Sequence, residues 1–126
     1  MYLLTEHLRE AIKQRNMFKN IFSTQGRIRR TEYGLSILIC LLILMIVNWM
    51  VGSSASATAS IALVFTFIPI IVFLVIQGIK RCHDLDRSGW YQLIPFFGLW
   101  LLFAEGTVGS NKFGDDPKLR MVPATI

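Results

Sequence analysis

A stretch of 47 residues, 33–79, contains no Asp, Glu, Lys, Arg or His. The rest of this 126-residue chain is too small to bury such a stretch inside a soluble domain. As one helix it would be about 70 Å long, more than twice the roughly 30 Å hydrocarbon core of a bilayer. The small and polar residues of 52–60 divide it into two parts. We therefore predict an all-α membrane protein in which two apolar helices, about 33–51 and 61–79, cross the bilayer.

Basic residues flank the uncharged stretch on both sides and are missing from the connecting segment 52–60. Seven Lys or Arg residues precede Tyr33, and Lys80, Arg81 and Arg87 follow the second apolar segment. Because positive residues stay on the cytoplasmic side of an inserted hairpin, we expect the N-terminus and this second group to face the cytoplasm. This asymmetry and contact with lipid headgroups account for the net charge of +5, so we expect no nucleic-acid partner.

The residues before the membrane domain, 1–21, form a segment with its own pattern. Apolar residues recur in it at helical spacing: Leu4, Leu8, Ala11 and Ile12. This pattern is typical of an amphipathic helix in the cytoplasmic headgroup layer, and a partly helical tail is the alternative. We assign 22–117 to the membrane domain and 118–126 to a C-terminal tail.

A third apolar segment, 90–104, has only 15 residues and is interrupted by Pro95 and Gly98. As a helix it would be roughly 22 Å long, which is short for a membrane span. One arrangement is a short spanning helix in a mismatched bilayer. The other is a re-entrant hairpin that turns at 95–98 and returns the C-terminus to the cytoplasm.

The charges downstream of this segment bear on the choice between the two arrangements. We favour the spanning helix, because the three basic residues that it would place outside are diluted by Asp115 and Asp116. The re-entrant hairpin makes a different prediction. It would allow these carboxylates to pair with Arg27, Arg30 or Arg81, which a spanning helix forbids.

Polar residues gather in three clusters, 22–33, 80–90 and 106–117. Together they resemble the bacterial inner-membrane family catalogued as domain of unknown function 805, the YhaH-like proteins. We write its pattern as F-x-G-R-x-x-R-x-E-aromatic, R-R-x-H-D-x-x-x-S-G-W and G-x-x-G-x-N-x-aromatic-G-x-D-P. The chain departs from it at Lys80, where Arg is usual, and at Gly34, where Trp is usual. The resemblance implies a location in the bacterial inner membrane and brings no established activity with it.

The first cluster places Arg27 and Arg30 three residues apart, next to each other if the segment is helical. Their guanidinium groups can bind lipid phosphates through bidentate hydrogen bonds. The alternative is that they set the topology and reach the headgroups without a specific ligand. We expect Glu32 to pair with one of them, or with Arg81 if the cytoplasmic ends of the two spans adjoin.

In the second cluster His83 is followed by Asp84. A carboxylate beside an imidazole can fix its tautomer and make it a base or a pH-sensitive switch. A general base also needs a nucleophile or a substrate pocket, and no Ser, Cys or metal-binding set converges on this pair in the sequence. One His and two Asp residues also fall short of the three or four ligands that zinc takes. We therefore predict no catalytic residue, no metal and no cofactor.

The structural interpretation of the same cluster is a tight loop between membrane segments. Asp84 or Asp86 would cap the turn, Arg81 would clamp it, and Ser88-Gly89 would start the next helix before Trp90. This interpretation requires no ligand.

The third cluster contains Asn111, Gly114, Asp116 and Pro117, which are residues typical of turns. Its paired acids could attract a divalent cation, but the spacing of an EF-hand is absent. We expect a structural turn.

These patterns predict a small polytopic membrane protein that acts as a structural or regulatory module. Its partners would be the bilayer, anionic lipid headgroups, and a membrane protein or a second copy of the chain. The candidate lipid- or partner-binding residues are Arg27, Arg30, Glu32, Arg81, His83, Asp84, Ser88, Gly89, Trp90, Asn111, Gly114, Asp116 and Pro117. The alternatives are a transporter or channel component, although 33–79 lacks the ionisable residues typical of such pathways, and a lipid-modifying enzyme using His83 and Asp84.

Overall fold

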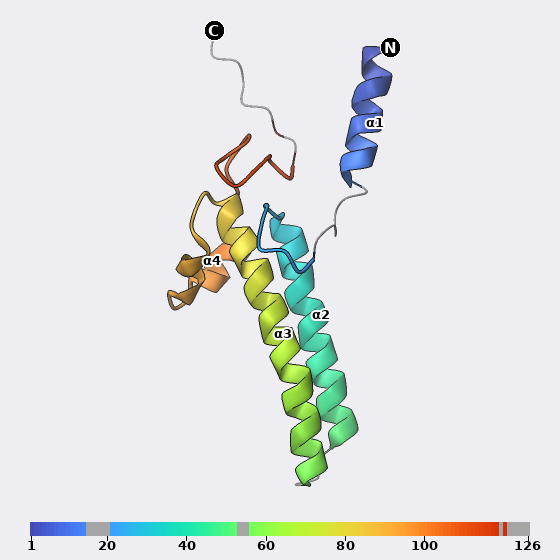
Figure 1. The fold of residues 1–126 in the computed structure, drawn as a ribbon, viewed down its shortest axis with the longest axis vertical. Coiled ribbons are helices and arrows are strands. Elements are labelled where there is room, and N and C mark those ends of the chain that lie inside the picture. The colour runs from blue at the N-terminus through green and yellow to red at the C-terminus, as the bar shows by residue number, and fades with distance from the viewer. Residues whose placement is uncertain (15–20, 53–55, 119, 121–126) are drawn as a thin grey trace.

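The computed structural model describes residues 1–14, 21–52, 56–118 and 120. In this part of the chain every regular element is a helix, which confirms the predicted fold class. In order, the elements are α1 (Tyr2–Gln14), α2 (Arg30–Val51), α3 (Ala57–Asp84), the 3₁₀ helix η1 (Gly89–Leu93) and α4 (Phe97–Phe103) (Figure 1).

The two longest helices, α2 and α3, lie side by side as an antiparallel hairpin (Figure 1). Both are long and apolar enough to cross a membrane. Large apolar side chains along the hairpin point outward, such as Met45 at 69% and Phe65 at 76% exposure. Lipid, rather than water, is the solvent that suits such a continuous apolar surface.

The turn between these helices shows why each one ends where it does. α2 ends at Gly52, which has a φ of 64° and donates its N–H to the Asn48 carbonyl at 3.1 Å. Glycine adopts this left-handed conformation without the penalty that a Cβ brings. α3 begins after Ser56, whose hydroxyl accepts the Ala59 N–H at 3.2 Å as an N-cap.

At its other end α3 continues to Asp84, beyond the uncharged stretch, and closes in a Schellman motif. The N–H groups of Asp86 and Arg87 donate to the carbonyls of His83 and Cys82 at 3.1 and 2.9 Å. Asp86 has a φ of 56°, in the left-handed region that Asp tolerates better than most residues. This motif turns the chain back toward the hairpin.

The third apolar segment forms no helix long enough to cross a membrane, which differs from the single spanning helix that we favoured and agrees in shape with the hairpin alternative, so we call it the re-entrant segment. The segment consists of η1, a turn at 94–96 and α4, which has seven residues and is roughly 10 Å long. Pro95 removes one backbone donor and disfavours helical geometry at the residue before it. Phe96 then takes a left-handed φ of 66°, which reverses the chain.

The buried core lies at the end of the hairpin where α2 begins and α3 ends. α4 packs against both helices there, and Leu101 is fully buried with Cys82, Tyr33 and Ile28. The core therefore fixes the re-entrant segment and the tail at the same end of the hairpin.

α1 forms a helix, as its periodicity predicted, and lies apart from this core. Among the described residues it contacts none of the other helices. Leu4 and Leu8, on its apolar stripe, are exposed.

Candidate functional site: a polar cap on the membrane hairpin

The Asp84 carboxylate is the centre of a buried polar network at this end of the hairpin. Arg27 donates from Nε to Oδ1 at 3.0 Å, and Arg81 forms an ion pair with Oδ2 through Nη1. Both guanidinium side chains are 1% exposed and the carboxylate side chain is 2% exposed. Removing such charges from water is costly, so each must find partners within the chain.

Arg81 connects α3 to the end of the re-entrant segment. Its Nε donates to the Leu101 carbonyl at 2.8 Å, and its Nη2 donates to the Ala104 carbonyl. These carbonyls belong to the last turn of α4 and to its C-cap residue, where carbonyls lack partners within the helix and carry partial negative charge. Arg81 therefore caps α4 and holds it against the hairpin.

Arg27 connects the segment before α2 to the C-terminal tail. Its Nη1 donates to the Gly109 carbonyl at 2.6 Å and to the Gly114 carbonyl at 3.2 Å. Its Nη2 donates to the Thr107 carbonyl at 2.6 Å. Arg27 and Arg81 carry two positive charges, and Asp84 carries only one negative charge. The carbonyl dipoles of the tail therefore compensate the remaining positive charge.

The tail in turn caps the last turn of α3. Thr107 donates its N–H and its hydroxyl to the Asp84 carbonyl at 2.8 and 3.1 Å. Asn111 donates from Nδ2 to the His83 carbonyl at 2.9 Å. We call the residues of this network the polar cap: Arg27, Arg81, His83, Asp84, Thr107, Asn111, Phe113 and Asp116.

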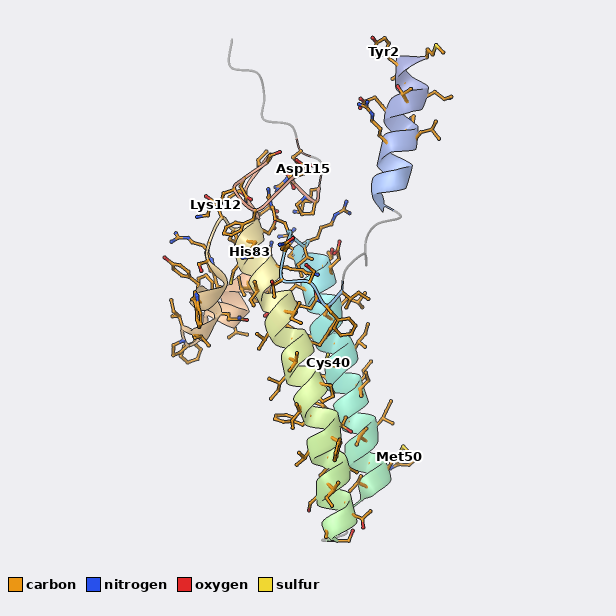
Figure 2. All side chains as sticks on the ribbon, viewed as in Figure 1. Tyr2, Cys40, Met50, His83, Lys112 and Asp115 are labelled. Atoms are coloured by element: carbon orange, nitrogen blue, oxygen red, sulfur yellow. The ribbon has the colours of Figure 1, made fainter. Side chains whose placement is uncertain are left out.

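His83 binds the tail through its ring and does not pair with its neighbour Asp84. The ring stacks on Phe113 with centroids 3.9 Å apart and an interplanar angle of 5°. Its Nδ1 lies 3.3 Å from the Gly26 carbonyl. His83, Lys112 and Asp115 appear at the same end of the hairpin in Figure 2. Because both Asp84 oxygens receive guanidinium donors instead, this geometry does not form an acid–base pair.

Asn111 organises the tail through three hydrogen bonds and gives a direct test of the cap. Besides the His83 carbonyl, its Nδ2 reaches the Thr107 hydroxyl at 2.9 Å, and its Oδ1 accepts the Phe113 N–H at 2.9 Å. We expect Asn111→Ala to destabilise the tail by about 1–3 kcal/mol, because buried partners lose their bonds. Hydrogen exchange should show faster exchange of the Phe113 and Thr107 amides, and unchanged protection there would contradict this role.

Asp116 is buried, at 3% exposure, and accepts three hydrogen bonds. The donors are the Gly109 N–H at 3.2 Å, the Lys118 N–H at 2.9 Å and Arg120 Nε at 2.9 Å. Burial by itself raises the pKa of Asp116, but these hydrogen bonds and the Arg120 charge outweigh it and hold the pKa below its ordinary value.

This lowered pKa predicts how the tail responds to acid. Because the folded state has the lower pKa, the stabilisation is complete above the pKa of the unfolded chain. It is lost as the pH falls through the lowered folded value. We expect acid to release the tail, as measured by proteolysis of the C-terminus, and Asp116→Asn to remove this part of the pH dependence. An unaltered pH profile in that variant would contradict the assignment.

Arg30 and Glu32 lie outside the buried network. Arg27 precedes the first turn of α2, so Arg27 and Arg30 do not lie next to each other as a helical segment would place them. Arg30 instead lies 3.4 Å from Glu105. Glu32 has Arg29 and Lys80 as its electrostatic neighbours. The pairing of Glu32 with Arg27, Arg30 or Arg81 stays a prediction.

The remaining candidate residues lie in the two turns. Ser88 precedes η1, and Gly89 begins it where a Cβ would meet the Ile79 side chain at 2.8 Å. Trp90 is 78% exposed on the outer face of η1. The Pro117 carbonyl accepts Arg29 Nε at 2.8 Å, which attaches the end of the tail to the start of α2.

Five residues in or next to the polar cap were not among the candidates from the sequence. Thr107 and Phe113 belong to the cap, and Glu105, Gly106 and Arg120 lie next to it. Phe113 and Gly106 are fixed positions of the tail motif, so the motif could have indicated them. Glu105 and Arg120 lie in no motif, and no sequence pattern indicated them. In the described part of the chain, no three His, Cys, Asp or Glu side chains converge as metal ligands would.

The fold is that of an all-helical membrane protein, in which two helices are long and apolar enough to cross a bilayer. A family model described as "Protein of unknown function (DUF805)" matches residues 21–115, so the chain belongs to that family. It is similar to "Inner membrane protein YhaI" of Escherichia coli (strain K12), at 36% identity over 114 residues, which cover 82% of this chain and 92% of the relative. It is also similar to "Inner membrane protein YhaH" of the same strain, at 37% identity over 116 residues covering 82% and 93%. No solved structure matches.

Proposed function

We propose that the chain is a two-pass membrane module whose polar cap faces the cytoplasm, and that exposed basic side chains around this cap bind anionic lipid headgroups. The observation that carries this proposal is the distribution of charge on the fold. All 13 Lys and Arg residues lie outside 33–79 in the sequence, and the re-entrant segment returns the tail to the end where α2 begins. The positive-inside rule then favours a cytoplasmic location for both ends of the chain.

The re-entrant segment supplies a second contact with the bilayer. Trp90, Phe96 and Trp100 are 78%, 83% and 60% exposed on its surface. Since the segment turns back after about half a bilayer thickness, this aromatic face would lie among the lipids of the cytoplasmic leaflet. Interfacial Trp side chains are typical of this depth.

Exposed basic side chains next to the polar cap would face the same layer. Arg87 is exposed and lies over the Tyr91 ring at 5.2 Å, and Lys112 is exposed and lies over the Phe113 ring at 5.1 Å. Anionic headgroups attract such juxtamembrane cations. The buried Arg27 and Arg81 have their donors occupied within the chain, so we assign them to holding the cap together.

The geometry gives less support to the alternatives. An enzyme using His83 and Asp84 would need the carboxylate or the imidazole to be available to a substrate, whereas both contact the chain itself. A regulatory role through a membrane-protein partner would use the same exposed basic face, and it is compatible with headgroup binding.

The test compares lipids in reconstituted vesicles. Full-length protein is placed in phosphatidylcholine containing a minor fraction of phosphatidylglycerol, and brominated versions of each lipid quench the tryptophan fluorescence. We expect the phosphatidylglycerol to quench more strongly at equal mole fraction, and the preference to weaken as ionic strength rises. Equal quenching by both lipids at low salt would contradict the proposal.

A further inference from the structure

Three basic side chains converge on one exposed carboxylate where α4 meets the tail. Glu105 Oε1 lies 3.4 Å from Arg30 Nη1 and 3.6 Å from Lys118 Nζ. Its Oε2 lies 3.2 Å from Arg120 Nη1. The cations come from the first residue of α2 and from the tail, so the fold brings them together. We name these four residues the Glu105 cluster.

The contacts of Glu105 are loose compared with those of Asp84. Glu105 is 61% exposed, against 2% for Asp84. Its distances to Arg30 and Lys118 exceed those of a hydrogen bond, and exposed ion pairs contribute little to stability. Glu105 can therefore leave the cluster without dismantling the cap.

Arg120 would remain in place if Glu105 moved away. Arg120 is also bound to Asp116 at 2.9 Å and to the Gly106 carbonyl at 3.0 Å. Among the described residues, Arg30 and Lys118 contact no carboxylate other than Glu105. Removing this carboxylate leaves positive charges close together without a nearby anion, which favours another anion in its position.

The cluster lies at the level where the apolar surface ends. Arg30 is the first residue of α2, whose residues from 33 onward are uncharged. Phe103, two residues before Glu105, is 74% exposed at the end of α4. In a bilayer the groups next to such a boundary meet the phosphates of the headgroups.

We propose that the Glu105 cluster binds the phosphate of an anionic phospholipid, and that Glu105 is an intramolecular competitor that occupies the site when the lipid is absent. The inference rests on the proposed function, because it names the residues that recognise the headgroup. A carboxylate and a phosphodiester both present a pair of oxygens that accept bidentate hydrogen bonds from guanidinium. Exchange of one for the other therefore needs little rearrangement of Arg30 and Arg120.

The proposal makes an unusual prediction for Glu105→Gln. If the carboxylate competes with lipid phosphate, its removal increases the affinity for phosphatidylglycerol relative to phosphatidylcholine, by about three- to fivefold. The measurement is the quenching of tryptophan fluorescence by brominated lipids in mixed vesicles, with the full-length protein. Combining Arg30→Gln with Lys118→Gln should lower the same ratio by a similar factor.

Asp86→Asn is the matched control. It removes the same charge from an exposed residue in the turn after α3, and Asn tolerates the left-handed φ of 56° at this position. Among the described residues Asp86 forms no ion pair. We expect it to change the lipid ratio by less than about 1.5-fold, because the ion pairs of the cluster are made by Glu105 and not by Asp86.

The outcomes separate the inference from the function on which it rests. An increase for Glu105→Gln no larger than that for Asp86→Asn would overturn the inference, even if the wild-type protein prefers phosphatidylglycerol. Equal affinity of the wild-type protein for both lipids would overturn the proposed function itself. If Glu105→Gln does not fold, the double variant decides: a lowered ratio supports the site, and an unchanged ratio overturns it.

Discussion

Asp84→Asn is expected to destabilise the polar cap by about 3–5 kcal/mol, the largest effect of any single substitution in this region. The reason is that the Arg27 and Arg81 guanidinium groups are each 1% exposed and share this one carboxylate. Neutralising it leaves two buried positive charges without an anion. In detergent, limited proteolysis should then cleave the tail and the re-entrant segment while the α2–α3 hairpin stays helical by circular dichroism.

The same charge change two residues away controls for effects of net charge. Asp86 is exposed, and Asp86→Asn should change stability by less than about 0.5 kcal/mol. Equal protease resistance of Asp84→Asn and Asp86→Asn would show that the buried carboxylate does not hold the cap together.

Gly106→Ala is expected to give the second-largest effect, a loss of about 1–3 kcal/mol from overpacking. A Cβ at this position would overlap the Asp84 carboxylate, which is itself fixed by two guanidinium groups and so cannot move aside easily. The substitution should loosen the tail where Thr107 binds the end of α3. Faster hydrogen exchange at the Thr107 amide, which donates to the Asp84 carbonyl, measures this directly.

Gly98 provides the comparison, because no described atom lies within 4 Å of a Cβ built there. It lies within α4, where alanine is a better helix former by up to about 1 kcal/mol. Gly98→Ala should therefore be neutral or slightly stabilising. If Gly106→Ala and Gly98→Ala changed the hydrogen exchange of the Thr107 amide equally, close packing would not explain the glycine at position 106.

The membrane hairpin follows from the sequence because it depends on composition over long stretches. Absence of charge across 33–79 requires two helices, and the small residues near Gly52 mark where they separate. The fate of the third segment depends instead on which groups pair in space. Arg81 caps α4 through the Leu101 and Ala104 carbonyls, and such a contact between distant residues leaves no local pattern.

For the polar clusters, too, the sequence indicates which residues matter locally but not which distant residues they contact. Sequence patterns singled out Arg81, Asp84 and Asn111, all of which the structure places in one network. They also suggested that Arg27 and Arg30 would be neighbours if their segment were helical, whereas the helix begins only at Arg30 and Arg27 contacts Asp84. The adjacency of His83 and Asp84 suggested a chemical pair, but successive residues of a helix point in different directions.

The central claim is that the re-entrant segment returns the tail to the side of the membrane on which α2 begins. Labelling with a membrane-impermeant thiol reagent tests it on three single variants, Thr5→Cys, Ser56→Cys and Asp115→Cys. Cys40 and Cys82 are buried, so the wild-type chain gives the background. We predict labelling of Ser56→Cys in intact spheroplasts, and of the other two variants only after the membrane is opened. Labelling of Asp115→Cys in intact spheroplasts, together with Ser56→Cys, would contradict the account.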